Sequence, residues 1–354
     1  MQRYNGTPME IMPPDEAIQQ QIKKNWDSLA KPLDGLGMFE TIFARIGAMQ
    51  RNTMPDIRRK AVLVMCADNG IVEEHISQSG QEVTAMVAES MGHGNSSVCK
   101  MAAAIGCEVI PVDIGINTDR VYPGVLPRKV SRGTANFLKT PAMTKEQAYA
   151  AINVGIELVE QCKQKGYGIL GTGEMGIGNT TTSSAMAAAL LGCPAERVTG
   201  RGAGLDDAGL KHKQQVIEEA LQQYQLKPEE ALRILCCVGG LDIAGMTGVF
   251  LGGALYHVPI VIDGVISAVA ALCASRLCPG TEAYMLPSHK GKEPAAGLLL
   301  QELSLQPVLE AGLALGEGTG TVFLFSMLDV ALTLYREGTT FADIALAPYE
   351  RYPK

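Results

Sequence analysis

The chain has 354 residues, of which 47% are hydrophobic and 19% charged, with 39 glycines and a formal net charge of −7. This composition is typical of a soluble globular protein and excludes a disordered or fibrous one. An acidic balance without a long basic run argues against nucleic acid or an anionic membrane as partner. The N-terminus lacks the basic start and apolar core of a signal peptide, so we expect a cytoplasmic protein.

The first predicted elements are helical. A polar helix is expected over residues 14–29, a turn over 31–37 and a second helix over 38–50. The next segment, KAVLVMCADNG at 60–70, is apolar and then polar, which predicts a buried strand that ends in a loop. The two helices are therefore interpreted as an accessory element before the sheet.

The same pattern of an apolar run ending in Gly or Asp recurs along the chain. It predicts further strands at residues 107–115 (ending at Asp113), 232–242 (ending at Asp242, with Cys236 and Cys237 on opposite faces) and 258–264 (ending at Asp263). Residues 167–181 are expected to form a strand, a glycine loop and the start of a helix. Helical patterns separate them at 145–165, 182–191, 209–223 and 243–255. This alternation predicts a doubly wound, Rossmann-like α/β fold with a mostly parallel sheet.

The uncharged stretch 243–262 is long enough to suggest a membrane span. Its four glycines, His257 and Pro259 favour a buried helix followed by a buried strand instead. The nine cysteines lack the paired spacing of zinc sites or disulfide scaffolds, so reduced core thiols are expected.

The glycine-rich segment GTGEMGIGNTTTSS, residues 171–184, has the clearest chemistry. Its glycines free backbone N–H groups and the following Asn and Thr residues can cap a helix, which favours a phosphate site. It lacks the Lys of a Walker A loop, and its GxGxxG letters alone are weak evidence for a dinucleotide. A helix cap without a ligand remains an alternative. A second loop, TGRGAGLDDAG at 199–209, precedes cationic residues that could neutralise a phosphate.

The five histidines show no HxxxH or HxH spacing, and no serine lies in a GxSxG motif. A metal enzyme and a serine-nucleophile enzyme are therefore disfavoured. Two carboxylates remain inside glycine loops: Glu174, and Glu317 in GEGTG at 316–320. Such a site suits displacement at a phosphorylated sugar, where one carboxylate removes a proton.

Segments along nearly the whole chain resemble one family, the nicotinate-nucleotide:dimethylbenzimidazole phosphoribosyltransferases of cobamide synthesis. VLVMCADNG, QEVTAM, VDIGI, GTGEMGIGNTT, VGGLDIAGMTGV, IDG, PSH and LGEGTG are similar to family segments and occur in the family's order. The resemblance implies that a 5,6-dimethylbenzimidazole-like base displaces nicotinate from nicotinate mononucleotide, giving an α-ribazole 5'-phosphate. It implies no metal and no organic cofactor.

The resemblance also assigns roles to residues. Glu317 matches the general base, and Glu174 is a candidate second acid or a structural residue. The nucleotide and its phosphate should meet Gly176, Asn179, Thr180, Gly202, Lys213, Asp242, Asp263, Ser288, Gly316 and Gly318, and the base should meet Ser79, Met175 and Leu315. The resemblance further implies three parts: an N-terminal helical part of a small domain (1–58), a large α/β domain (59–305) and a C-terminal segment that completes the small domain (306–354).

Several positions depart from the better-known family pattern. KPLDGLG replaces KPPGSLG, ADNG replaces ADHG, and Val87 stands where a Gln is expected in the base pocket. A lost amide removes a hydrogen-bond partner, so the base could be a benzimidazole variant, a purine or a phenol. The resemblance implies a homodimer, with a paralogous heterodimer, and a catalytically weak subunit within it, as alternatives. A nicotinamide-dinucleotide dehydrogenase is a further alternative, disfavoured because the first strand ends in ADNG rather than GxGxxG.

Overall fold

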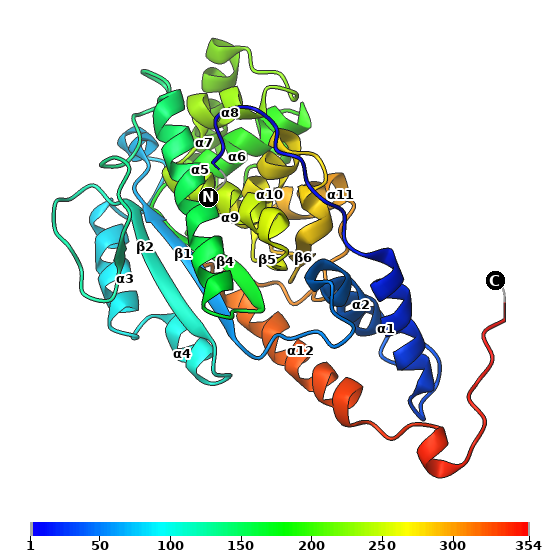
Figure 1. The fold of residues 1–354 in the computed structure, drawn as a ribbon. Helices are drawn as coiled ribbons and strands as arrows, with labels where there is room; N and C mark the ends of the chain where they lie inside the picture. Colours follow the sequence, from blue (N-terminus) through cyan, green and yellow to red (C-terminus); the bar gives the residue numbers. More distant parts are fainter. Residues whose placement is uncertain (1–2, 353–354) are drawn as a thin grey trace.

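A computed structural model describes residues 3–352, and its centre is one six-stranded sheet. All strand pairs are parallel, in the order β3-β2-β1-β4-β5-β6 (Figure 1). The strands are β1 (Lys60–Ala67), β2 (Glu108–Gly115), β3 (Leu126–Pro127), β4 (Ile169–Met175), β5 (Ile260–Ile262) and β6 (Met285–Pro287). This is the strand order of Rossmann-type folds, so the predicted fold class is confirmed.

Helices cover both faces of the sheet. Leu63 and Met65 of β1 pack in a core with the helices α5 (Lys145–Gln164), α6 (Asn179–Leu191), α8 (Ala231–Val238), α9 (Leu241–Tyr256) and α10 (Val265–Leu277). Val62 and Val64 pack in a second core with α2 (Met38–Gln50), α3 (Glu82–Gly92), α4 (Ser97–Ala103) and α12 (Thr319–Glu337). Alternate residues of one strand thus face opposite layers, as the twofold period of a strand requires.

The remaining helices are α1 (Glu16–Ser28), α7 (Asp207–Tyr224) and α11 (Ala295–Glu302), with short 3-10 turns at η1 (Gly70–Glu74), η2 (Ala195–Arg197), η3 (Thr281–Tyr284) and η4 (Ala342–Ile344). Among the described residues, no helix is long and apolar enough to cross a membrane. The stretch 243–262 is a buried helix followed by a buried strand, as predicted.

One predicted strand is wrong. Residues 232–242 form helix α8 and the start of α9, not a strand. Cys236 and Cys237 are therefore neighbours on a helix rather than strand residues on opposite faces, and Asp242 lies in the first turn of α9 rather than at a strand end. The apolar residues of this segment recur at helical spacing. A short run rich in Ile, Leu and Val fits a buried strand equally well, so the spacing did not decide the prediction.

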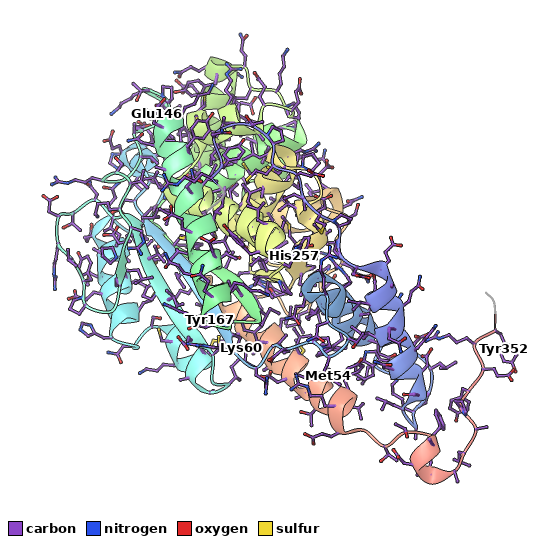
Figure 2. All side chains as sticks on the ribbon, in the orientation of Figure 1. Met54, Lys60, Glu146, Tyr167, His257 and Tyr352 are labelled. Atoms are coloured by element: carbon purple, nitrogen blue, oxygen red, sulfur yellow. The ribbon has the colours of Figure 1, made fainter. Side chains whose placement is uncertain are left out.

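The two ends of the chain meet beside the sheet. Trp26 of α1, Phe43 of α2 and Tyr335 of α12 pack together, with ring centroids 4.9–6.3 Å apart. At the start of β1, the buried ammonium of Lys60 lies 2.5 Å from a carboxylate oxygen of Asp329 and fixes α12 to the sheet (Figure 2). The division into segments 1–58, 59–305 and 306–354 stays a prediction; residues 1–2 and 353–354 of it lie outside the described residues.

Helices α5 and α9 cross so closely that Gly155 has no room for a side chain. A Cβ there would lie 2.1 Å from the carbonyl oxygen of Gly245. We expect Gly155→Ala to lower the free energy of unfolding by about 1–3 kcal/mol, because the two helices must separate. Urea denaturation measures this. Gly297→Ala on α11 is the matched control, since a Cβ there meets only the flexible Lys290 chain, 3.4 Å away. Equal stability of both variants would contradict the close packing.

Candidate active site

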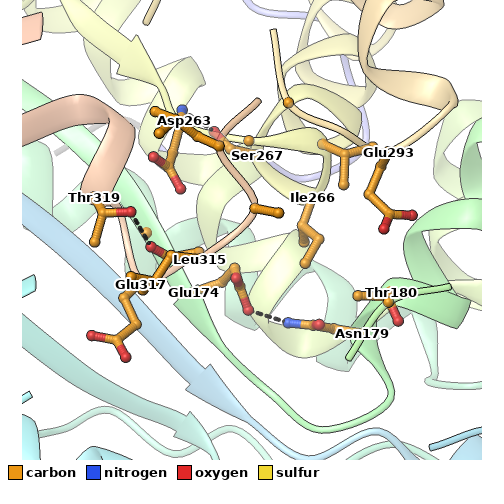
Figure 3. A pocket seen from close by; sticks show the side chains of 18 of the residues that line it. Glu174, Asn179, Thr180, Asp263, Ile266, Ser267, Glu293, Leu315, Glu317 and Thr319 are labelled. Carbon is orange, nitrogen blue, oxygen red and sulfur yellow. Dashed lines mark hydrogen bonds between the residues drawn. The ribbon is translucent and has the colours of Figure 1, made fainter. Parts of the chain in front are cut away.

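A cavity of about 260 Å³ lies at the carboxyl ends of β4 and β5. Its walls are the loop after β4, the loop at 202–203, the start of α10 and the segments 289–293 and 313–319. In Figure 3, Glu317 lies toward one end of the cavity, Asn179 and Thr180 toward the other, and Glu174 between them. β4 adjoins β1, where the strand order reverses, which is the place where α/β sheets bind ligands.

The GEGTG loop has an unusual backbone. Gly316, Glu317 and Gly318 have φ angles of 83°, 59° and 91°, so three successive residues lie in the left-handed region. Glycine adopts this region freely, whereas Glu317 does so at a cost. The Oε2 atom of Glu317 accepts a hydrogen bond from the N–H of Val98, 3.0 Å away, in the first turn of α4. The strained backbone therefore holds a carboxylate at the cavity wall.

Asp263 holds this loop in place by hydrogen bonds. Its two carboxylate oxygens accept hydrogen bonds from the N–H groups of Gly318 (3.2 Å), Gly320 (2.7 Å) and Thr321 (3.3 Å) at the start of α12. Burial raises the pKa of Asp263 to about 7, while these N–H groups act in the opposite direction. Asp263 thus lines the cavity and also positions the loop that carries Glu317.

A hydrogen-bonded carboxyl group lies in the middle of the cavity. The side-chain amide of Asn179 donates to Glu174 and to Asp242, which is 3.0 Å away. Burial, with smaller contributions from nearby acids, raises the pKa of Glu174 to about 8, and burial raises that of Asp242 to about 6. Glu174 is therefore mainly protonated at neutral pH and can donate a hydrogen bond.

A buried cation lies behind the other end of the cavity. Lys213 on α7 is 0% exposed, and its ammonium donates to Oγ1 of Thr180 at 2.9 Å. Among residues 3–352, no carboxylate lies within 4 Å of this ammonium. Burial lowers the pKa of Lys213 to about 8, while the charge of Glu293, which lines the cavity, acts in the opposite direction. A Cβ on Gly202 would lie 3.3 Å from its Nζ. A buried ammonium that forms no ion pair within 4 Å suits an anionic ligand.

The structure brings most of the predicted site residues together. The lining includes Glu174, Met175, Gly176, Asn179, Thr180, Gly202, Asp263, Leu315, Gly316 and Glu317. Lys213, Asp242 and Gly318 do not line the cavity but are hydrogen-bonded to residues that do. Buried Ser288 donates instead to backbone carbonyls beside the wall, and Ser79, in the loop before α3, is not part of the lining.

Sequence reasoning missed other lining residues. His289, Lys292 and Glu293 come from the segment after β6, and Ile266 and Ser267 begin α10. The PSH segment was a visible signal for His289, but Ile266 and Glu293 have no local pattern that separates them from ordinary helix and loop residues.

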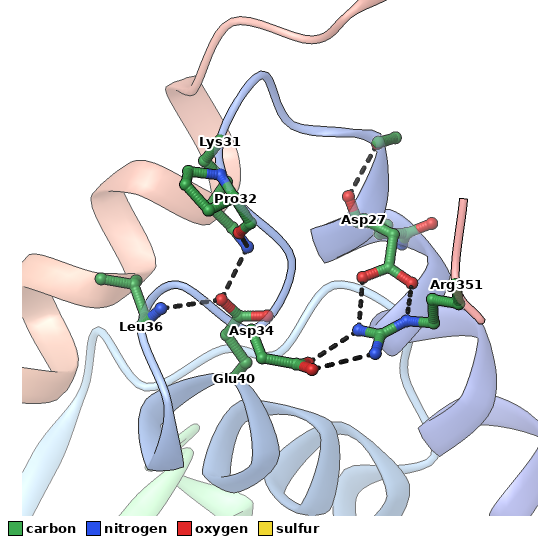
Figure 4. Close-up of polar contacts among 9 residues, drawn as sticks. Asp27, Lys31, Pro32, Asp34, Leu36, Glu40 and Arg351 are labelled. Carbon is green, nitrogen blue, oxygen red and sulfur yellow. Dashed lines mark hydrogen bonds and ion pairs between the residues drawn. The ribbon is translucent and has the colours of Figure 1, made fainter. Parts of the chain in front are cut away.

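The one cluster of three acids spaced to hold a cation among the described residues lies outside the cavity, at Asp27, Asp34 and Glu40. Figure 4 shows that Arg351 pairs with Asp27 and Asp34, while Lys31 pairs with Glu40 at 2.6 Å. The acids are thus neutralised by basic side chains, and the cluster ties the C-terminal segment to α1.

Together, the sheet order and the cavity define a Rossmann-like α/β protein whose cavity is lined by carboxyl groups and has a buried cation behind it. Comparison with known proteins narrows this class. A family model described as phosphoribosyltransferase matches residues 11–345, so the chain belongs to this phosphoribosyltransferase family.

Similar proteins support the same assignment. The chain is 41% identical over 336 residues to the nicotinate-nucleotide–dimethylbenzimidazole phosphoribosyltransferase of Clostridium acetobutylicum, a match that covers 95% of this chain and 96% of the relative. It is 40% identical to the enzyme of the same name from Chloroflexus aurantiacus, over 98% and 99% of the two chains. The crystal structure of CobT from Thermus thermophilus matches with a TM-score of 0.88 at 36% identity, over 94% of this chain and 99% of that one.

Proposed function

We propose that the protein transfers phosphoribose from nicotinate mononucleotide to 5,6-dimethylbenzimidazole or a related base, releasing nicotinate and giving an α-ribazole 5'-phosphate. The observation that carries the proposal is a single cavity with a carboxylate, Glu317, at one end and a buried ammonium, Lys213, behind the other. The names of the similar phosphoribosyltransferases support the choice of substrates.

The phosphate is proposed to bind at the end formed by Thr180, Gly202 and Lys213, with Gly176 and Asn179 beside it. A phosphate would form an ion pair with the buried ammonium, which has no carboxylate within 4 Å in the described residues, and the start of α6 favours an anion. The ribose then extends past Glu174 and Asp263, and the base is proposed to lie between Met175, Leu315 and Glu317.

In the proposed reaction, one ring nitrogen of the base attacks C1' of the ribose. The bond from C1' to the nicotinate nitrogen breaks, and nicotinate leaves with the electron pair. The proton on the other ring nitrogen of the base passes to Glu317, so the product is neutral at the new ribazole ring. Protonated Glu174 keeps Asn179 in place beside the phosphate, and Asp263 holds the loop of Glu317.

We further propose a cytoplasmic homodimer formed through an apolar groove between α2 and α12. Leu36, Phe39, Met327, Val330 and Leu334 line this groove. Val330 is 75% exposed in the single chain, so covering this face with a second copy would remove apolar surface from water.

A panel of acceptor bases tests the function. Purified protein with nicotinate mononucleotide is expected to release nicotinate in step with ribazole phosphate formation when a benzimidazole is present. The panel includes adenine and phenols, because the chain has Val87 where the family resemblance implies a Gln that contacts the base. Size-exclusion mass with and without a paralogous chain accompanies the assay. No product with any base from the chain alone would contradict the single-subunit function and point to a required partner subunit.

A further inference from the structure

A buried histidine lines the cavity and has no role in the reaction described above. His289 follows β6 and is 6% exposed. Its ring packs against the first turn of α12, because a Cβ on Gly320 would lie 2.1 Å from Nδ1 and 2.8 Å from Oδ1 of Asp263. His289 therefore lines the cavity beside Asp263 and Gly320, the last residue of the GEGTG loop.

The hydrogen bonds of Ser288 determine which nitrogen of His289 carries the proton. The Ser288 hydroxyl lies 2.7 Å from the carbonyl oxygen of Ile262 and 3.2 Å from that of Asp263, and both can only accept. The hydroxyl therefore donates its single proton to these carbonyl oxygens. The third contact, from Ser288 Oγ to Nδ1 of His289 at 2.9 Å, then requires Nδ1 to be the donor.

The other ring nitrogen is left as an acceptor. Burial lowers the pKa of His289, so at neutral pH the ring carries its one proton on Nδ1 and a lone pair on Nε2. Within residues 3–352, Nε2 has no hydrogen-bond partner, and His289 lines the cavity, so a bound ligand can meet this nitrogen. A ligand in this part of the cavity must supply a donor, or this nitrogen loses the hydrogen bond it would make with water.

The groups of the proposed substrates differ in what they offer. A phosphate dianion and the nicotinate carboxylate only accept, so a lone pair on Nε2 repels them. The N–H of the incoming base is directed to Glu317 in the proposed reaction. The ribose hydroxyls are the donors that remain, and they belong to the part of the nucleotide that lies between the phosphate and the reacting carbon.

We propose that Nε2 of neutral His289 accepts a hydrogen bond from a ribose hydroxyl of the nucleotide, and so helps to select a ribosyl over a deoxyribosyl donor. This inference rests on the proposed function, because it takes nicotinate mononucleotide as the substrate.

Two substitutions separate recognition from packing. His289→Asn places an amide nitrogen near the position of Nδ1, so it keeps the donor to Ser288 and removes the acceptor at Nε2. His289→Gln places an amide near the position of Nε2 and restores an acceptor there. The measurement is kcat/KM for nicotinate mononucleotide and for its 2'-deoxy and 3'-deoxy analogues, with wild type and both variants.

Wild type is expected to prefer the ribosyl substrate over at least one analogue. In His289→Asn, the preference over that analogue should fall about three- to tenfold, the value of one neutral hydrogen bond. His289→Gln should retain most of it. A packing role would slow all three substrates equally and leave the preference unchanged, and that result would overturn the inference, as would a wild type that does not distinguish the three substrates.

The two proposals fail in different ways. No turnover of nicotinate mononucleotide by wild type with any base contradicts the proposed function and removes the substrate on which the inference depends. Turnover by wild type with a preference that neither variant changes contradicts the inference alone. Because the preference of wild type is itself a readout, the inference stays testable even if one variant does not fold.

Discussion

Glu317→Gln is expected to lower kcat for a benzimidazole acceptor by about two to four decades, the usual contribution of a positioned general base. The fold should be unchanged, because the Gln side-chain oxygen can still accept the hydrogen bond from Val98 N–H that Glu317 accepts at 3.0 Å. Steady-state kinetics measures the first effect and urea denaturation the second. Glu310→Gln, at an exposed position on the same segment, is the matched control and should leave kcat unchanged.

A second acceptor shows whether the loss reflects proton removal. A 1-methylbenzimidazole has no ring N–H, so its attack on C1' leaves a cationic product and no proton for Glu317 to take. We expect Glu317→Gln to slow this acceptor far less than the parent benzimidazole. Equal loss with both acceptors would mean that Glu317 acts through geometry or charge rather than as a base, and a large loss of stability would assign it to capping α4.

Most of the sheet was predictable because its strands are buried on both faces. β1 is an almost continuous apolar run, and β2 and β4 join apolar residues to Gly or Asp, a pattern that favours strands of a parallel sheet. The segment 232–242 was not predicted correctly, since a short apolar run fits a buried helix as well as a strand. Its residues Ala231, Ile234, Leu235 and Val238 do recur at helical spacing. β3 and β6 have two and three residues and were not predicted, whereas the equally short β5 lies in a longer apolar run, VPIVI.

The residues of the candidate site that could be predicted are charged side chains inside glycine-rich loops. Glu174 and Glu317 stand out because a charged residue inside a glycine loop needs a partner or a function, and both line the cavity. Contacts between residues that are far apart in the sequence could not be predicted. The hydrogen bonds from the α12 amides to Asp263 join residues 55 to 58 positions apart, and the lone pair of His289 follows from three contacts in space.

Lys213→Met is expected to weaken substrate binding while making the free protein more stable. The Met side chain fills a similar volume without a charge. Since charge-assisted hydrogen bonds contribute more than neutral ones, KM for nicotinate mononucleotide should rise about 10- to 100-fold. Without ligand, the ammonium is 0% exposed and has no carboxylate partner within 4 Å in the described chain. Removing it should therefore raise the free energy of unfolding at pH 7 by on the order of 1–3 kcal/mol.

The effects of Lys213→Met on the free energy of unfolding and on KM should both depend on pH. The pKa of Lys213 is lowered from 10.5 to about 8 by burial, so the folded protein gives up this proton more readily than the unfolded chain. The cost of burying the charge is fully present below pH 8 and disappears as the pH rises toward 10.5, so the stability advantage of Lys213→Met should shrink over that range. As the pH rises over the same range, Lys213 of the wild type loses its positive charge, and the KM of the wild type should increase toward that of the variant.

The control is Lys211→Met, at an exposed lysine two residues away on α7, which should change neither the stability nor the KM. A variant that is both less stable and unchanged in KM would show that Lys213 supports the fold rather than an anionic substrate.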